Sequence, residues 1–144
     1  MKAITHNILM CNTKKCSGTD KNYPFIIKPT DILNREVEFD LNRTQKIYEK
    51  QDKRGLNQYC KDLNIFKYDF TTVDDATKKQ NEFWEYVHHV INETMVNEGI
   101  LICPNCNREY PIKNGIINMV LKDEEMWTYL NFIYFKINIL IIRF

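Results

Sequence analysis

Residues 101–121 read LICPNCNREYPIKNGIINMVL and combine a closely spaced cysteine pair with a pattern typical of a β-hairpin. Two runs, 108–113 and 116–121, flank Asn114-Gly115, and the second is rich in aliphatic residues. Asn-Gly favours a type I′ turn, because both central residues of that turn need a positive φ. We therefore predict a hairpin here. Pro111 has no N–H to donate, so we expect its strand to lie at a sheet edge or to turn its N–H side outward.

A second cysteine pair lies near the start of the chain. Cys11 and Cys16 are five positions apart, and Cys103 and Cys106 are three apart. A four-cysteine zinc site needs two such arms, each turning its sulfurs toward one centre. A redox pair would need a βαβ context, which this end of the chain lacks, and unliganded thiols are the remaining alternative. We predict one structural Zn²⁺ per chain, with the ligands Cys11, Cys16, Cys103 and Cys106.

We interpret the other notable residues, including the fifth cysteine and two of the histidines, as structural. Asn107 and Gly18 follow the two cysteine pairs, where tight turns need a positive φ. Cys60 falls at an apolar position of a predicted helix and is interpreted as a small core residue. His88 and His89 are adjacent and would point about 100° apart on a helix, so they cannot chelate one ion together. The sequence has no phosphate-binding loop, G-x-S-x-G or H-E-x-x-H motif, and we predict no catalytic or cofactor-binding residues.

The composition narrows the class of protein. The chain has 144 residues, of which 44% are hydrophobic and 27% charged, so it can form a folded core. Its net charge of +1 lacks the basic excess of proteins whose main partner is nucleic acid. The N-terminus has no apolar stretch of signal-peptide length, so we expect a reducing compartment, where clustered cysteines bind metal.

The middle of the chain predicts helices. Apolar residues recur at helical spacing from about Arg43 to Leu63 and from about Asp75 to Met95. Gly55 would divide or kink the first stretch, and Gly99 would stop the second. We therefore predict an α+β fold, in which a small zinc-ribbon-like β unit is built from both chain ends, 1–39 and 97–125, with a helical insertion at 40–96.

Residues 126–144 read MWTYLNFIYFKINILIIRF and are more apolar than the rest of the chain. Their length is near the roughly 18 residues of a membrane span, but Lys136 would cost about 2.5–3.5 kcal/mol on insertion. Nearly every residue from 129 to 142 can be written with codons of A and T alone. Our hypothesis is a tail translated from an intron or other AT-rich sequence; a tail anchor and a partner-binding helix are the alternatives. A transcript with one uninterrupted exon through codon 144 would overturn it.

Three ordered motifs carry a resemblance to a known family. They are Met1-Lys2-x-x-Thr5-His6-Asn7-x-Leu9-x-Cys11, Val37-Glu38-Phe39-Asp40, and Glu98-Gly99-x-Leu101-x-Cys103-Pro104-x-Cys106-x-Arg108-x-Tyr110-Pro111-Ile112-x-x-Gly115-Ile116-x-Asn118-Met119-x-Leu121. Through them, residues 1–125 resemble the multifunctional methyltransferase subunits, also called tRNA methyltransferase 112 homologues. The family usually has Pro where this chain has Ile117, and Gly where it has Asn107.

The resemblance implies a zinc-ribbon-like subunit that activates several S-adenosylmethionine-dependent methyltransferases without binding the methyl donor itself. Their substrates are tRNA, ribosomal RNA and a translation release factor. We therefore expect heterodimers with class I methyltransferases in the cytoplasm and nucleus, RNA contact only through the catalytic partner, and membrane contact only if the apolar tail is genuine. Two alternatives stay open: a thiol oxidoreductase using the second cysteine pair, and a zinc ribbon that binds RNA phosphates through Lys14, Lys15, Lys21 and Lys28.

An unpaired sheet edge is a template for pairing with a strand of another protein. We therefore place partner binding on the N-terminal segment and on the second run of the hairpin. Because side chains alternate along a strand, about half of the hairpin residues should face the interior instead. The predicted partner-binding residues are Thr5, Asn7, Ile116, Ile117, Asn118, Met119 and Val120.

Overall fold

The computed structural model describes residues 1–126 and contains a four-stranded antiparallel sheet in the order β1-β2-β3-β4. The strands are β1 (Ile26–Asn34), β2 (Thr94–Ile102), β3 (Glu109–Lys113) and β4 (Ile116–Ile117). A short helix, α1 (Ala3–Ile8), precedes the sheet, and it was not predicted from the sequence. The remaining helices lie between β1 and β2 and are α2 (Leu41–Glu49), α3 (Lys53–Asp62), α4 (Asp75–Lys78) and α5 (Asn81–His88), the last continued by a π-helical turn (His89–Glu93).

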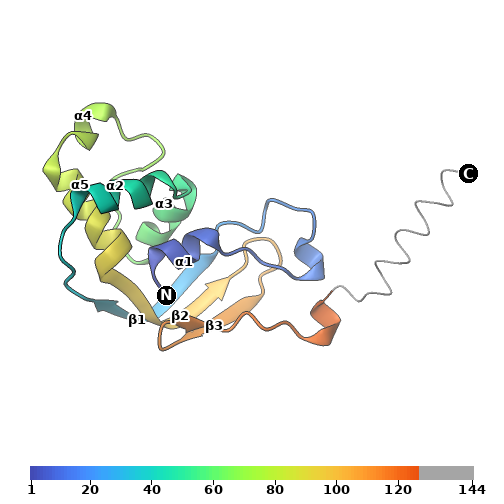
Figure 1. Cartoon of the computed structure of the whole chain (residues 1–144). Helices are drawn as coiled ribbons and strands as arrows, with labels where there is room; N and C mark the ends of the chain where they lie inside the picture. The colour runs from blue at the N-terminus through green and yellow to red at the C-terminus, as the bar shows by residue number, and fades with distance from the viewer. Residues whose placement is uncertain (127–144) are drawn as a thin grey trace, which may run out of the picture.

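The elements form a sheet with helices at one end and cysteine-bearing loops at the other. Figure 1 shows α1 against the sheet, with α2 to α5 gathered at one end of the molecule. Two 3₁₀ turns, Lys14–Cys16 and Asp123–Glu125, lie at the opposite end. The predicted α+β fold with a helical insertion is confirmed. The hypothesis on the apolar tail lies outside the described residues, apart from Met126. None of the helices in residues 1–126 is long and apolar enough to cross a membrane.

The predicted hairpin is confirmed at its turn. Asn114 and Gly115 have φ of 52° and 75°, and Lys113 pairs with Ile116 across them. The second strand is shorter than its sequence run, because regular pairing ends after Ile117. The first of the two alternatives for Pro111 is wrong: β3 is not an edge strand, since it lies between β2 and β4. The second alternative holds. The Pro111 carbonyl accepts a hydrogen bond from the Asn118 amide at 2.9 Å, and the nitrogen of the same strand residue points to the same side, toward the outer edge of the sheet.

The predicted helix up to Met95 is wrong at its C-terminal end. Helical structure stops at Glu93, and the next nine residues form β2, an inner strand. Met95 fits the helical spacing by coincidence, whereas burial over 94–96 alternates as in a strand, with Thr94 and Val96 buried and Met95 half-buried. Gly99 therefore does not stop a helix. It lies in β2 with φ of 157°, and a Cβ there would lie 2.6 Å from the Lys28 carbonyl oxygen of β1.

The first helical stretch divides, but not at Gly55. The break falls between α2 and α3, where the Asp52 carboxylate caps α3 by accepting from the Arg54 amide at 2.9 Å. Gly55 lies buried inside α3, and a Cβ on it would lie 2.7 Å from the Asn7 side-chain nitrogen. The absence of a side chain at Gly55 therefore allows α3 to pack closely against α1.

The core joins the sheet to the helices. Aromatic side chains from α2, α5 and the loop after α3 meet edge to face, as Tyr48 does with Phe83 and Trp84 at ring distances of 5.9 and 5.5 Å. Other large, fully buried side chains come from the residue that precedes β1 and from α3, β2 and β3. They include Phe25, Leu56, Tyr59, Leu101, Tyr110 and Ile112.

Candidate metal centre

The four clustered cysteines come from two loops at opposite ends of the sequence. Cys11 follows α1, Cys16 ends the first 3₁₀ turn, and Cys103 and Cys106 lie between β2 and β3. The β2–β3 loop is tightened by hydrogen bonds of 2.9 Å from the Cys103 amide to the Arg108 carbonyl and from the Asn107 amide to the Cys103 carbonyl. Asn107 has φ of 59° and Gly18 has φ of 73°, which confirms the positive φ predicted for both.

The sulfur positions fit a tetrahedral metal ion. All four Sγ atoms lie within 4.8 Å of one another. The Cys11–Cys106 and Cys16–Cys103 pairs are each 3.6 Å apart. Bonds of about 2.3 Å to zinc at tetrahedral angles put sulfurs about 3.8 Å apart, so an ion fits between these atoms with little movement. The structure therefore brings together the four residues predicted as metal ligands.

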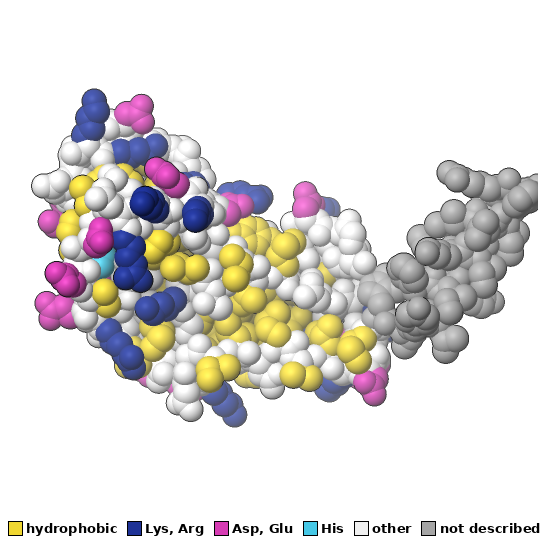
Figure 2. All heavy atoms as spheres, in the orientation of Figure 1, with side chains coloured by type: hydrophobic (Ala, Val, Ile, Leu, Met, Phe, Trp, Pro, Cys, Tyr) yellow, Lys and Arg dark blue, Asp and Glu magenta, His cyan; other side chains and the backbone are white. Residues whose placement is uncertain are grey.

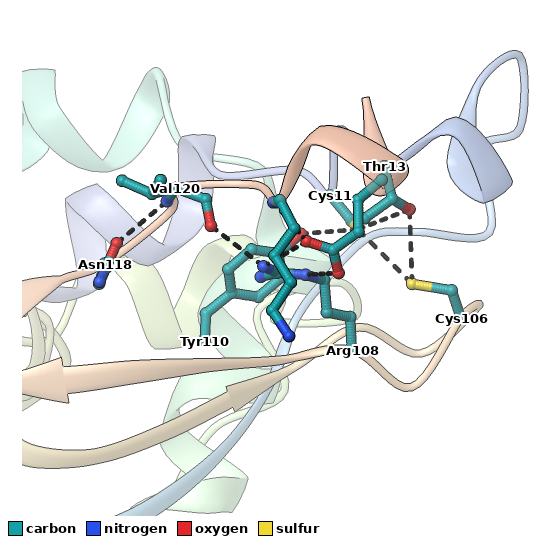
Figure 3. A network of polar contacts seen from close by, with 9 residues as sticks. Cys11, Thr13, Cys106, Arg108, Tyr110, Asn118 and Val120 are labelled. Atoms are coloured by element: carbon teal, nitrogen blue, oxygen red, sulfur yellow. Dashed lines mark hydrogen bonds and ion pairs between the residues drawn. The ribbon is translucent and has the colours of Figure 1, made fainter. Parts of the chain in front are cut away.

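Hydrogen-bond donors surround the sulfurs. The Cys106 amide donates to Cys103 Sγ at 3.5 Å, and the Asn105 side-chain amide donates to Cys16 Sγ at 3.3 Å. The Tyr110 hydroxyl lies 3.0 Å from Cys11 Sγ (Figure 3). Such donors favour the thiolate, which is the form that binds metal.

The thiols of the cluster differ in acidity. Burial raises the pKa of Cys11, but hydrogen bonds from Thr13 and Tyr110 outweigh burial and bring that pKa to about 7. Burial raises the pKa of Cys103 to about 12. All four sulfurs point to one centre, so an ion bound there would have a full set of protein ligands and no position for a reacting water. The four cysteines could therefore bind a metal ion in a structural role.

The remaining cysteine and the histidines lie apart from the metal cluster. Cys60 is fully buried in α3, which confirms its interpretation as a core residue. His88 Nε2 donates a hydrogen bond to the Val37 carbonyl, and His88 Nδ1 accepts one from the Asn92 side-chain amide, each at 2.9 Å. His89 Nδ1 lies 2.8 Å from a Glu93 carboxylate oxygen. These contacts fix the turn between α5 and β2.

The residues predicted to bind a partner divide into exposed and internal groups. Thr5 is exposed on α1, whereas Asn7 is buried and both ends of its amide bond the backbone of Asp52. Beyond the hairpin turn the burial alternates along the chain. Ile116, Asn118 and Val120 are exposed, with 74% and 77% exposure for the two apolar side chains, while Ile117 and Met119 are half-buried against the core.

Sequence reasoning missed several residues that support the centre. Tyr110 and Thr13 contact the sulfurs, and the Asn22 side chain donates to the Cys11 carbonyl at 2.9 Å. Arg108 pairs with Glu125, 17 positions further along the chain. Tyr110 lies four positions after Cys106, which is a weak sequence signal that it contacts the metal site. No spacing rule connects Asn22 or Glu125 to that site.

Comparison with known proteins identifies relatives that cover nearly the whole chain. A model of the family described as Trm112p-like protein matches residues 2–115. The multifunctional methyltransferase subunit TRM112 homolog A of Arabidopsis thaliana is 30% identical over 127 residues, which are 88% of this chain and 100% of that protein. The multifunctional methyltransferase subunit TRM112-like protein of Mus musculus is 32% identical over 128 residues, 89% of this chain and 100% of that protein.

A solved structure shares the fold. It is the E. cuniculi Mtq2-Trm112 complex responsible for the methylation of the eRF1 translation termination factor, and one of its chains aligns with a TM-score of 0.55 and 20% sequence identity. The alignment covers 83% of this chain and 95% of that chain. With a family match over residues 2–115 and relatives matched over their whole length, the chain belongs to the Trm112p-like protein family.

Proposed function

We propose that this chain is a non-catalytic subunit that activates and stabilises S-adenosylmethionine-dependent methyltransferases acting on tRNA, ribosomal RNA and a translation release factor. The observation that carries the proposal is the match over the entire length of relatives named multifunctional methyltransferase subunits. The complex of the structural relative, which pairs Mtq2 with Trm112, supports heterodimers with class I methyltransferases. A closed four-sulfur centre supports a role outside catalysis.

Zinc is the metal that the cysteine cluster fits best. Four thiolates in a tetrahedral arrangement are typical of structural zinc, and soft sulfur ligands disfavour magnesium and calcium. The ion would connect the loop after α1 to the β2–β3 loop and so fix both loops at one end of the sheet.

The proposed interface is the outer edge of the sheet beside β4, together with the exposed side of α1. Figure 2 shows hydrophobic side chains spread across the middle of the face on which α1 and the sheet are seen in Figure 1. Exposed apolar residues on these elements and their flanks are Ile8, Met10, Ile116 and Val120. A partner strand paired with this edge would hide such side chains, and binding to the folded partner alone would stabilise that partner by mass action.

Direct RNA binding is less well supported. Lys14 and Lys15 are exposed beside an open cavity of about 360 Å³, but Glu124 and Glu125 line the same cavity. Lys21 and Lys28 are also exposed, yet they lie outside that cavity's lining, and the chain has a net charge of only +1. RNA contact is therefore proposed to occur through the catalytic partner, and location in the cytoplasm and nucleus stays a prediction.

Co-expression with methyltransferases of the same organism tests the proposal. A methyltransferase that resembles the Mtq2 chain should become more soluble and co-purify with this subunit at a 1:1 ratio. Binding of the isolated subunit to tRNA at low salt, without any methyltransferase that forms a stable pair with it, would favour the RNA-binding alternative.

A further inference from the structure

Arg108 anchors the segment that follows β4. Its guanidinium donates to the two carboxylate oxygens of Glu125 at 2.5 and 2.8 Å, and to the Val120 carbonyl at 3.0 Å. The two charged side chains are only 17% and 25% exposed. A paired guanidinium and carboxylate in partial shelter from water is among the stronger polar contacts in proteins.

Glu125 in turn shapes the end of that segment. Its carboxylate accepts from the Lys122 amide at 2.7 Å, which closes the last 3₁₀ turn. The hydrogen bond from Arg108 is the main cause that lowers the pKa of Glu125 to about 2, so the carboxylate is ionised at neutral pH. Arg108 thus contacts the segment at both Val120 and its 3₁₀ turn.

The Arg108 guanidinium also contacts Tyr110, a neighbour of the cysteine cluster. The guanidinium carbon lies 4.3 Å from the ring centre of Tyr110, a fully buried side chain. The hydroxyl of the same tyrosine lies 3.0 Å from Cys11 Sγ. Figure 3 shows Arg108, Tyr110, Cys11 and Val120 in one view. The guanidinium–ring contact joins the hydrogen bond of Arg108 to Val120 with the contact of Tyr110 to Cys11.

The backbone at Val120 also determines where the exposed edge points. The Val120 amide donates to the Asn118 side-chain oxygen at 3.1 Å, and the Asn118 amide donates to β3 at Pro111. Regular strand pairing has already ended at Ile117, so sheet hydrogen bonds alone do not fix this segment. The hydrogen bond from Arg108 to the Val120 carbonyl therefore holds the chain beyond β4, where strand pairing does not.

We propose that Arg108 is a positioning residue that couples the metal centre, through Tyr110, to the edge formed by Ile116, Asn118 and Val120. Cys11, whose Sγ lies 3.0 Å from the Tyr110 hydroxyl, would be fixed in place if the four sulfurs held a metal ion. Tyr110 then supports the guanidinium that holds Val120. The expected effect on partner binding rests on the proposed function. The coupling between the metal centre and the edge does not, because it depends on this chain alone.

Hydrogen–deuterium exchange of the zinc-loaded subunit tests the positioning step. The variant Arg108→Met should keep one zinc per chain, yet amides of residues 118–126 should exchange about tenfold faster, because a charge-assisted contact is lost. Arg108→Lys should give an intermediate rate, since lysine keeps the charge without the planar fork. The matched control is Glu82→Gln, which breaks the exposed Lys67–Glu82 pair in the helical part and should leave residues 118–126 unchanged.

The absorption of the cobalt-substituted protein tests the coupling step. Sulfur-to-cobalt bands report on the surroundings of the cysteine thiolates, so Tyr110→Phe should shift them directly and Arg108→Met should shift them through Tyr110. Wild-type exchange rates in Arg108→Met would overturn the inference. Faster exchange with unshifted bands would also overturn it, because Arg108 would then be a local clamp without connection to the metal.

A binding measurement separates this inference from the proposed function. The probe is the organism's own methyltransferase that resembles Mtq2, titrated with zinc-loaded subunit. The inference expects about tenfold weaker binding of Arg108→Met than of the wild type. Equal affinity of the two proteins contradicts the inference, whereas failure of the wild type to bind contradicts the proposed function.

Discussion

Asn7 fastens α1 to the turn between α2 and α3. Its side-chain nitrogen donates to the Asp52 carbonyl at 2.7 Å, and its oxygen accepts from the Asp52 amide at 2.9 Å. We expect Asn7→Ala to lower the free energy of unfolding by about 1–3 kcal/mol, because both backbone groups lose this partner. Thr5→Ala, on the exposed side of the same helix, should change it by about 0.5 kcal/mol or less. Urea unfolding measures both, and equal stability of the two variants would contradict this role for Asn7.

The five cysteines should respond differently to substitution. Cys103→Ala or Cys106→Ala removes one of four sulfurs that lie within 4.8 Å of one another, so each should lose the metal and unfold the end of the sheet. Cys60 lies in the core, away from the cluster, so Cys60→Ala should keep one zinc per chain. We expect this variant to lower the free energy of unfolding by about 1 kcal/mol. Elemental analysis together with circular dichroism checks both outcomes. A well-folded wild-type chain without zinc would falsify the structural role of the metal.

At the level of elements, the exposed residues beyond the hairpin turn should determine partner binding. Ile116→Asp and Val120→Asp change side chains that are 74% and 77% exposed, so the melting temperature should stay near that of the wild type. Both variants should bind the methyltransferase at least about tenfold more weakly, because a charge enters a desolvated contact. Met119→Asp is the contrasting variant, since Met119 packs against the core and its loss should lower the melting temperature.

Asn118→Pro tests the edge through the backbone. The change removes the amide that donates to the Pro111 carbonyl and disturbs regular pairing, while the metal loop is untouched. We expect normal zinc content and lost methyltransferase binding. If this variant and Val120→Asp both stay folded and co-purify the methyltransferase at wild-type yield, the interface lies elsewhere, and the helical insertion becomes the first surface to examine.

The elements that could be predicted are those fixed by local chemistry. Asn114-Gly115 predicts its turn, because few other dipeptides accept two positive φ values. The spacing of Cys103 and Cys106 predicts a metal-binding loop. The helix-to-strand change at Thr94 was missed, since apolar residues that alternate on an inner strand can also match a helical period. The contact between Arg108 and Glu125 has no sequence signal, because it depends on how the chain folds back beyond β4.

At the scale of the whole molecule, the metal centre joins loops that are far apart in sequence. Cys16 and Cys103 are 87 positions apart, and β1 and β2, which lie between them in the sequence, flank helices α2 to α5. Structural zinc contributes about 10–16 kcal/mol in finger peptides, against about 5–15 kcal/mol for the stability of a whole domain. We therefore expect chelation to abolish the cooperative thermal unfolding transition, and added zinc to restore it. Circular dichroism that records the same transition with and without chelator would contradict this expectation.

The central proposal is that this chain supports methyl transfer without performing it. The most direct measurement is methyl transfer from labelled S-adenosylmethionine by the subunit, by its methyltransferase partner, and by the two together, with calorimetry of S-adenosylmethionine on the subunit alone. We expect no transfer and no binding of the methyl donor by the subunit, weak transfer by the partner, and a marked increase for the pair. Micromolar binding of S-adenosylmethionine by the isolated subunit, or equal turnover with and without it, would contradict the account.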